Sequence, residues 1–478
     1  MTIDDRAPTG TGFDALPDDC VVVPAGSAQR GLWLTQELDP ASPAYLITNA
    51  FEIDGDLDVP ALAAALDELV VRHESLRTGF LSVGNEIHQV IHETVPSVLR
   101  MVDAATDEDV AAAVERENST PFDLTRPPLL RVLLLRRAAG RHALVVALHH
   151  IVVEGVSIEL LWADLAVLYS AAVDGSPAGL PELPLRYADF AAWQDEWMRT
   201  DDYREQLGFW RDQLTGAPPA ITLPDAAADG PSWQGGSHSV WLSEAETASV
   251  AAFARRHDAT SFMALLMVFS GVLHRWSAQA DVIVGTPVTL RDQPGLENVV
   301  GLLINSVPVR VTWGDDPTAA DALRRVRTAT AEAMAHKQVP FDHLVTALPE
   351  LRGPGRDPIM QVMFAYQDEL GAETGLRLAD TSIRPIPVRV RTAKFDLSLD
   401  CVIERRRLRC AFEWSDDRLD QDLVRLFADH FLLSLRHVLG HGQARVGEWP
   451  LIDQPSTPDW LAGFLGDEPA TAGGDPDE

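Results

Sequence analysis

The chain has 478 residues, of which 46% are hydrophobic, and its 39 Lys and Arg residues are outnumbered by 71 Asp and Glu residues. A chain of this length exceeds one ordinary core, so it predicts two packed domains of a few hundred residues each. Its net charge of −32 repels phosphate backbones and anionic lipids, which disfavours nucleic acids and membranes as partners.

The ends of the chain and its cysteines bear on location. The acidic, Gly/Pro-rich ends, residues 1–19 and 461–478, are predicted to be disordered, because they lack the apolar groups that offset ordering entropy. No charged leader precedes an apolar stretch, and no uncharged apolar segment approaches membrane-spanning length. Cys20, Cys401 and Cys410 form no C-x-x-C pair, which indicates buried thiols in a reducing compartment. We therefore expect a cytoplasmic protein.

The first half of the chain alternates helical and extended periods. Pro60 suits a first helical turn, and apolar residues recur at helical spacing from there to His73. The apolar runs that start at Leu129 and His142 flank a turn at residues 138–140 and predict a hairpin buried on both faces. The second strand of that hairpin ends at two adjacent histidines.

A helix is predicted soon after these histidines. Ser157 is a good N-cap, and Leu161, Leu165 and Leu168 follow on one helical face. His149 and His150 therefore lie on a loop between a strand and a helix. Histidine at a strand end can present a nitrogen of near-neutral pKa to a cleft, although such a pair is often only a packed imidazole.

A Pro/Gly-rich break at residues 175–186 predicts a domain boundary, with one lobe over 20–178 and a second over 179–460. Helices and strands alternate in both halves, which predicts two α/β lobes. In the second half we expect helices over 244–257, 261–276 and 318–337, strands over 281–288, 302–311 and 359–367, and a hairpin over 395–414.

The segment HHIVVEG, from His149 to Gly155, resembles the HHxxxDG signature of the condensation domains of nonribosomal peptide synthetases. Further motifs of that family occur in order over about 370 residues, and their order makes chance an unsatisfactory explanation. These motifs are SAQ with LW at 27–33, RHESLRTGF at 72–80, YADFAAWQ at 187–194, FW with QL at 209–214, VGTP with an arginine at 284–291, the glycine and asparagine at 301 and 305, VPFD at 339–342 and KFDL at 394–397.

The resemblance implies a fold and a set of roles. The fold would be two chloramphenicol-acetyltransferase-like lobes in a V-shaped pseudo-dimer, with the active site in a tunnel between them. His150 would be the catalytic histidine and His149 would support the loop. A backbone N–H near Gly155 could face the oxyanion. Glu154 replaces the family's Asp and would form a structural, bidentate ion pair with Arg291.

The family also implies a reaction. We expect a free-standing condensation enzyme of natural-product biosynthesis that joins an acyl thioester to an amine or alcohol, giving an amide or an ester. No bound cofactor or metal is expected. The thioester would be held by the phosphopantetheine arm of an acyl or peptidyl carrier protein acting in trans, because no LGGxS carrier segment occurs in the sequence. The acceptor would be a small molecule.

Four alternatives stay open on the sequence. The chain could be an acyl-CoA-dependent acyltransferase of the same superfamily, although the DFGWG element of its plant-type members is absent. It could be an epimerase relative, which needs an added acid that the sequence does not reveal. It could be a catalytically silent module that recruits a carrier protein. Finally, His149, His150 and Glu154 could bind a metal, although adjacent strand residues point to opposite faces.

Overall fold

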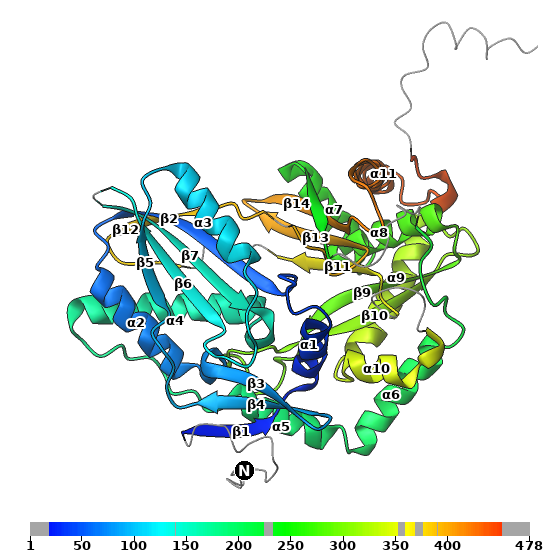
Figure 1. The fold of residues 1–478 in the computed structure, drawn as a ribbon. Helices are drawn as coiled ribbons and strands as arrows, with labels where there is room; N and C mark the ends of the chain where they lie inside the picture. Colours follow the sequence, from blue (N-terminus) through cyan, green and yellow to red (C-terminus); the bar gives the residue numbers. More distant parts are fainter. Residues whose placement is uncertain are drawn as a thin grey trace, which may run out of the picture.

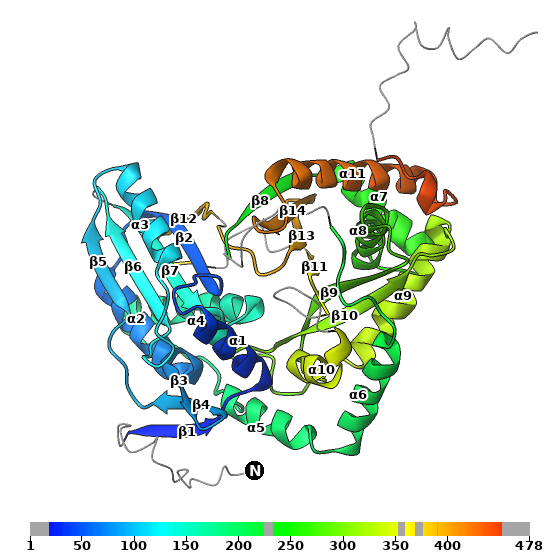
Figure 2. The same cartoon turned by 45° about the vertical axis from the view of Figure 1, so that its right-hand side comes forward.

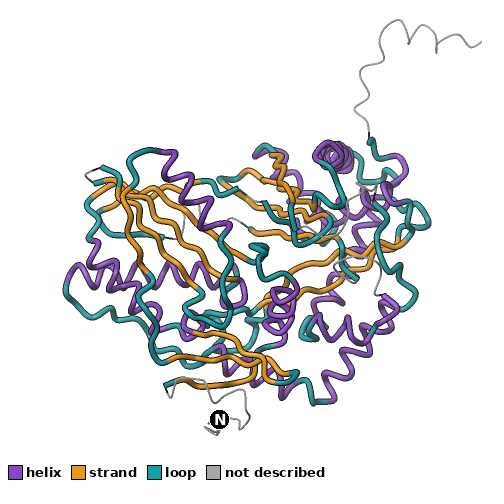
Figure 3. Tube along the Cα trace, in the orientation of Figure 1, coloured by secondary structure: helices purple, strands orange, loops and turns teal. Residues whose placement is uncertain are grey.

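The computed structural model describes residues 19–138, 140–223, 233–351, 359–368, 376–389 and 391–451. Apart from Asp19, the two ends predicted to be disordered lie outside the described residues, and so does the middle residue of the predicted turn at 138–140. The described residues form two lobes, each with its own sheet and its own helices (Figure 1, Figure 3).

The first lobe is built on a five-stranded sheet. Its strands lie in the order β12 (Thr381–Ile386), β2 (Leu46–Gly55), β7 (Arg141–His149), β6 (Leu130–Arg136) and β5 (Leu99–Asp103). The helices of this lobe are α2 (Val59–Arg72), α3 (Asp107–Ser119) and α4 (Gly155–Asp174). Asp58 caps the first turn of α2 by accepting from the Ala61 N–H at 2.9 Å, and Pro60 lies in that turn as predicted.

Strands β6 and β7 form the predicted antiparallel hairpin, and alternate residues enter two different cores. Val132 and Leu134 of β6 join the core beneath α2 and α4, whereas Leu133 and Leu135 join the core beneath α3. The expectation of a hairpin buried on both faces is confirmed. A strand covered on both faces needs apolar residues at every position, which explains its unbroken apolar run.

A small third sheet completes the first lobe. It contains β1 (Cys20–Pro24), β4 (Glu86–His92) and β3 (Thr78–Val83), in that order. Phe80 and Ile87 from this sheet join the core beneath α2 and α4. A short 3-10 helix, η1 (Glu74–Arg77), leads from α2 into β3.

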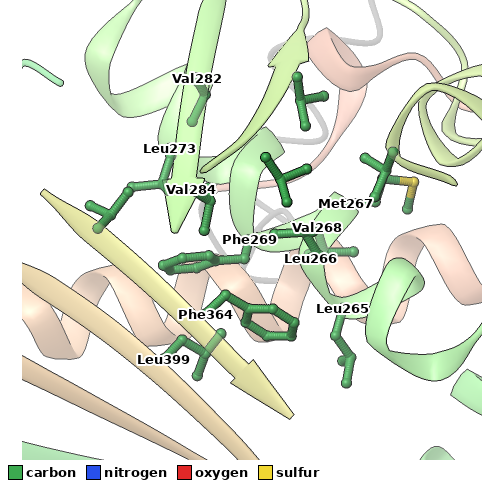
Figure 4. Packing of buried hydrophobic residues seen from close by; sticks show 14 of the residues in the cluster. Leu265, Leu266, Met267, Val268, Phe269, Leu273, Val282, Val284, Phe364 and Leu399 are labelled. Carbon is green, nitrogen blue, oxygen red and sulfur yellow. The ribbon is translucent and has the colours of Figure 1, made fainter. Parts of the chain in front are cut away.

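The second lobe is built on a six-stranded sheet. Its strands lie in the order β10 (Ile304–Thr312), β9 (Asp281–Thr289), β11 (Val362–Gln367), β13 (Leu397–Glu404), β14 (Arg407–Ser415) and β8 (Gly235–Trp241). Four helices pack against one face of it, namely α7 (Glu244–Arg256), α8 (Ser261–Ser277), α9 (Ala319–Ala335) and α11 (Gln421–Gly440). Figure 4 shows the core between the sheet and these helices, where Phe269 of α8 contacts Phe364 of β11. The predicted helices and strands of this half are present, with ends shifted by a few residues.

The remaining helices lie where the lobes meet or along the edge of the second lobe. They are α1 (Ser27–Leu38), α5 (Tyr187–Trp197), α6 (Asp201–Leu214) and α10 (Phe341–Ala347), together with η3 (Pro349–Leu351) and η4 (Val446–Glu448). Figure 2 shows α1 between the two lobes, beside α10. The Ser27 hydroxyl of α1 donates to the Asp342 carboxylate of α10 at 2.7 Å.

One strand departs from the simple division of the chain. Strand β12 falls within the range 179–460 predicted for the second lobe, yet it pairs with β2 at the edge of the first sheet. Ile383 of β12 lies opposite Ile53 of β2. The exposed edge of a sheet offers unpaired backbone groups, and β12 satisfies those of β2. The second half of the chain therefore contributes one strand to the first lobe, which a boundary placed at a single residue does not capture.

Helix α4 is long and apolar enough to pass a membrane-span test by length and composition. Its contacts within the lobe explain that composition. Leu161, Leu165 and Leu168 are buried in the core of the first lobe, and the Asp164 carboxylate accepts from the Arg72 guanidinium at 2.7 Å. The helix is a core helix of the first lobe.

Candidate active site

The segment between β7 and α4 carries the predicted histidines. Strand β7 ends at His149, a 3-10 turn η2 spans His150–Val152, and α4 begins at Gly155. The predicted N-cap at Ser157 is wrong, because the cap is Glu154. Its carboxylate accepts from the Val156 N–H at 2.8 Å and from the Ser157 N–H at 3.1 Å. The signature acid therefore fixes the start of the helix that follows the histidines.

The predicted ion pair between Glu154 and Arg291 is present and joins the two lobes. Only 6% of the Glu154 side chain and 8% of the Arg291 side chain are exposed. The expected bidentate geometry is wrong, since Nε and Nη2 of Arg291 both donate to one oxygen, Oε1. Oε1 also accepts from the Ser157 N–H, and the other oxygen, Oε2, accepts from the Val156 N–H. The glutamate carboxylate thus bonds the other lobe through Oε1 and the first turn of its own helix through both oxygens.

Two further contacts, which the sequence did not reveal, fix the same loop. The Ser157 hydroxyl donates to the Gly301 carbonyl at 2.9 Å and accepts from the Gly301 N–H at 3.1 Å, so it bridges the lobes. Gln29 of α1 donates from Nε2 to the Ile151 carbonyl at 3.2 Å. Gln29 and Gly301 both belong to motifs that resemble the family, but only the fold shows that they support this loop.

His149 has the geometry of a supporting residue. Its side chain is buried, and its Nδ1 accepts from the Ile151 N–H at 3.1 Å. Phe122 packs edge-on against the ring, with centroids 6.3 Å apart. Burial lowers the pKa of His149 to about 3, so the ring is neutral at physiological pH. This arrangement agrees with the predicted role of His149 in holding the loop.

His150 is placed differently from its neighbour. It is half-buried, and its backbone N–H donates to the Tyr45 carbonyl at 2.9 Å. Its Nδ1 is buried without a hydrogen-bond partner among the described residues. Burial first, and the positive charge of Lys394 second, lower the pKa of His150 to about 4. The ring is therefore neutral at pH 7, which leaves a ring nitrogen able to accept a proton.

Gly155 lies in open space at the first turn of α4. A Cβ built on it would meet only the Gln367 amide nitrogen of the second lobe, at 3.9 Å. Its backbone N–H has no hydrogen-bond partner within the described part of the chain. The position is therefore open to a ligand, as a backbone donor for an oxyanion must be.

Nε2 of His149 and Nδ1 of His150 have no hydrogen-bond partner among the described residues, but the other candidate ligand atoms of the loop are engaged. Nδ1 of His149 already accepts from a backbone N–H, and both carboxylate oxygens of Glu154 are occupied. Across the described ranges, no three His, Cys, Asp or Glu side chains are grouped so that they could hold a metal ion.

Comparison with known proteins agrees with this loop and fold. A family model described as "Condensation domain" matches residues 21–459. The chain belongs to the condensation-domain family. Tyrocidine synthase 3 from Brevibacillus parabrevis is 31% identical over 448 residues, which cover 93% of this chain and 7% of that protein. Phosphinothricin tripeptide synthetase PhsC from Streptomyces viridochromogenes is 38% identical over 397 residues, which cover 80% of this chain and 36% of that protein.

Solved structures of condensation domains share the fold. The X-domain in the complex of the X-domain and OxyB from teicoplanin biosynthesis superposes with a TM-score of 0.82 at 27% identity, covering 94% of this chain and 100% of that one. SgcC5 from Streptomyces globisporus superposes with a TM-score of 0.72 at 24% identity, covering 88% and 100%. The predicted pair of acetyltransferase-like lobes is confirmed. The chain spans only a small part of the curated synthetases that it matches.

Other motifs of the condensation domain pack around the loop. A Cβ on Gly301 would lie 2.1 Å from Cδ2 of Tyr187, so glycine is required for the two motifs to pack together. Asn305 donates from Nδ2 to the Lys337 and Val339 carbonyls at 2.8 and 2.7 Å. These contacts are structural, as we expected for the motifs other than the histidine loop.

Proposed function

We propose that this condensation domain joins a carrier-bound acyl thioester to an amine or alcohol acceptor, forming an amide or an ester in natural-product biosynthesis. The observation that carries the proposal is His150, a half-buried and neutral imidazole on a loop that bonds to both lobes. A neutral imidazole can accept the proton that the acceptor loses as it attacks.

The proposed reaction balances without a cofactor or an oxidant. The acceptor nitrogen or oxygen bonds to the thioester carbonyl carbon, and its proton moves to His150. The carbonyl oxygen becomes an oxyanion in the tetrahedral intermediate, where the free N–H of Gly155 would donate to it. The C–S bond then breaks, and the proton passes from His150 to sulfur, which leaves as a thiol. Nδ1 of His150 has no hydrogen-bond partner among the described residues that would compete with these steps.

The proposed donor is the phosphopantetheine arm of an acyl or peptidyl carrier domain, which would reach His150 through a tunnel between the lobes. The sequence contains no LGGxS carrier segment, so we propose that a carrier domain outside these 478 residues supplies the thioester. Holding thioester and acceptor at one loop would supply much of the rate by proximity. The net charge of −32 means that an acidic carrier would dock on a local basic area.

The test is intact-mass analysis of acyl-loaded carrier proteins incubated with the chain and a pool of amine and alcohol acceptors. The wild type is expected to remove the acyl adduct from one carrier, and the product mass identifies donor and acceptor together. His150→Ala is expected to lower the rate by at least about 100-fold. His142→Ala is the matched control, because His142 lies at the other end of strand β7. Equal activity of His150→Ala and wild type would refute the assignment.

Two competing functions are outcomes of the same experiment. A recruiting module would bind a carrier without turnover, and a neighbour crystallised as a complex of the X-domain and OxyB gives this candidate a specific basis. Binding without loss of the adduct, with every acyl carrier and acceptor offered, would support it. Replacing the loaded carrier by the corresponding acyl-CoA tests the second alternative, since an acyl-CoA-dependent acyltransferase would form product without a carrier.

A further inference from the structure

Lysine is scarce in this chain, and one of its two lysines lies beside Tyr45, which bonds to His150. Of the 39 basic residues, 37 are Arg and two are Lys, at positions 337 and 394. Lys394 lies just before β13 in the second lobe. Its neighbour Ala393 donates its N–H to the Trp233 carbonyl at 3.0 Å, and the Asp396 N–H donates to the Gln361 carbonyl at 2.9 Å. The backbone on both sides of Lys394 is therefore fixed in the second lobe.

The side chain of Lys394 crosses to the first lobe. Its Nζ lies 5.2 Å from the centre of the Tyr45 ring. Tyr45 is the residue whose carbonyl accepts from the His150 N–H, and its ring centre lies 6.5 Å from that of His149. Cations lie favourably over aromatic rings. The Lys394 ammonium thus lies beside Tyr45, whose carbonyl bonds to His150, and it approaches Tyr45 from the second lobe.

The charge of Lys394 is not cancelled by an ion pair. No carboxylate of the described residues forms a salt bridge with its Nζ. Burial lowers the pKa of Lys394, and the acids that oppose this shift and favour its ammonium form are Glu413 of β14 and Asp400 of β13. Burial raises the pKa of both acids, that of Glu413 to about 7, so Glu413 carries only part of a negative charge at neutral pH. Arg409, which also faces these acids, donates to Glu404 at 2.7 Å.

A positive charge on Lys394 lies close enough to act on both histidines. Lys394 acts with burial to lower the pKa of His149 and of His150. The other titratable groups of the loop add no free charge, because His149 is neutral at physiological pH and Glu154 is paired with Arg291. An amine acceptor that attacks beside His150 enters the same field. A positive charge disfavours a second positive charge nearby and favours the free base of an amine.

We propose that Lys394 is a positioning residue whose ammonium, brought to the catalytic loop from the second lobe, repels the protonated form of an amine acceptor and so favours attack by the neutral amine beside His150. This inference rests on the proposed function and deepens it. An alcohol acceptor has no ammonium form to disfavour, so the residue matters for amines and not for alcohols. Arginine keeps the charge and is expected to substitute for lysine here.

The test compares transfer to a primary amine and to its hydroxyl analogue with the same carbon skeleton. Lys394→Met is expected to lower the ratio of the amine rate to the alcohol rate about tenfold at pH 7, which corresponds to about one pKa unit at the bound amine. The loss is expected to vanish as the pH rises above the pKa of the free amine. Lys394→Arg restores the ratio. Lys337→Met, which removes the other lysine, is the matched control.

A second measurement needs no turnover. In protein labelled with ¹³C at histidine Cε1, the His150 signal is assigned as the one missing in His150→Ala. Its titration midpoint is expected to rise by about one pH unit in Lys394→Met and to stay unchanged in Lys337→Met. An unchanged midpoint in Lys394→Met, or an equal loss with both acceptors, would overturn the inference. A shifted midpoint without transfer by the wild type would instead refute the proposed function alone.

Discussion

The two ends of the loop between β7 and α4 are held in opposite ways. At Glu154 both carboxylate oxygens are bonded, to the first turn of α4 and to Arg291 of the other lobe, and the side chains of Glu154 and Arg291 are buried. At His150 the backbone makes one bond to Tyr45, while the ring is half-buried and its Nδ1 has no partner among the described residues. We call the Glu154 end, where the carboxylate is fully bonded, the saturated end, and the His150 end the unsaturated end. The saturated end fixes the position of the loop, and the unsaturated end leaves a histidine free for substrate.

The largest effect on stability is expected at the saturated end. Arg291→Met leaves the Glu154 carboxylate buried without its partner, which costs about 3–5 kcal/mol in the free energy of unfolding. Urea unfolding monitored by circular dichroism measures this cost. The matched control is Arg324→Met, since the side chain of Arg324 is 64% exposed and pairs only with Asp321 in its own helix. A loss no greater than that of the control would show that the buried pair does not stabilise the loop.

The unsaturated end is expected to make stability depend on pH. Burial holds the pKa values of His149 and His150 at about 3 and 4, below the value of about 6.5 in the unfolded chain. Between these values the unfolded chain binds more protons, so stability falls as the pH falls from 6.5 toward 4. Glu413, with its pKa raised to about 7, opposes this trend because the folded chain binds its proton first.

The contribution of His150 to this pH dependence can be measured apart from those of His149 and Glu413. His150→Asn removes one of the two protons, so the mean slope of unfolding free energy against pH between 6.5 and 5 should fall by about 1 kcal/mol per pH unit. Urea unfolding at four pH values in this range gives the slope for both proteins. His238→Asn, on the edge strand β8 of the other lobe, provides the comparison outside the loop. Parallel slopes for wild type and His150→Asn would show that His150 is not held neutral in the folded state.

A smaller loss of stability is expected from a substitution at Gly301, which packs against Tyr187. Gly301→Ala forces a Cβ to within 2.1 Å of the Tyr187 ring, and overpacking of this kind costs about 1–3 kcal/mol. Gly208→Ala in α6 is the control, since nothing lies within 4 Å of its added Cβ, and it should stabilise the chain by up to about 1 kcal/mol. Thermal unfolding of both variants gives the comparison. Equal midpoints would show that Tyr187 can move aside.

Many helices and strands could be predicted because the sequence patterns that indicate them lie within short segments. The apolar runs of β6 and β7 and the helical periods of α7 and α8 are properties of neighbouring residues. The contact between Glu154 and Arg291 was predicted from the family motifs, although they are 137 positions apart. The roles of His150 and Gly155 in catalysis stay predictions, because geometry alone shows that they are available and not that they react.

The features that the sequence did not predict are of two kinds. Some are contacts between residues far apart in the chain, and one is a choice between two residues that could each cap the same helix. Strand β12 pairs with β2, more than 300 positions earlier, and nothing within its own six residues indicates that partner. Ser157 is the better N-cap by type, yet Glu154 performs the capping because Arg291 holds its carboxylate over the helix. The contact of Lys394 with Tyr45 depends on how the two lobes meet, which no local pattern records.

The smallest expected effect comes from two substitutions at Glu154 that distinguish the contribution of its charge from that of its length. Glu154→Asp keeps the charge and introduces a preferred N-cap residue, so its cost in the free energy of unfolding is expected to stay below about 1 kcal/mol. Glu154→Gln keeps the length but leaves Arg291 buried against a neutral amide, for an expected loss of about 2 kcal/mol. Urea unfolding ranks the two variants. An Asp variant less stable than the Gln variant would mean that the reach of the longer chain, and not its charge, holds the loop across the lobes. In that case the transfer rate of the Asp variant should fall with its stability, because His150 would lose the fixed position from which it meets both reactants.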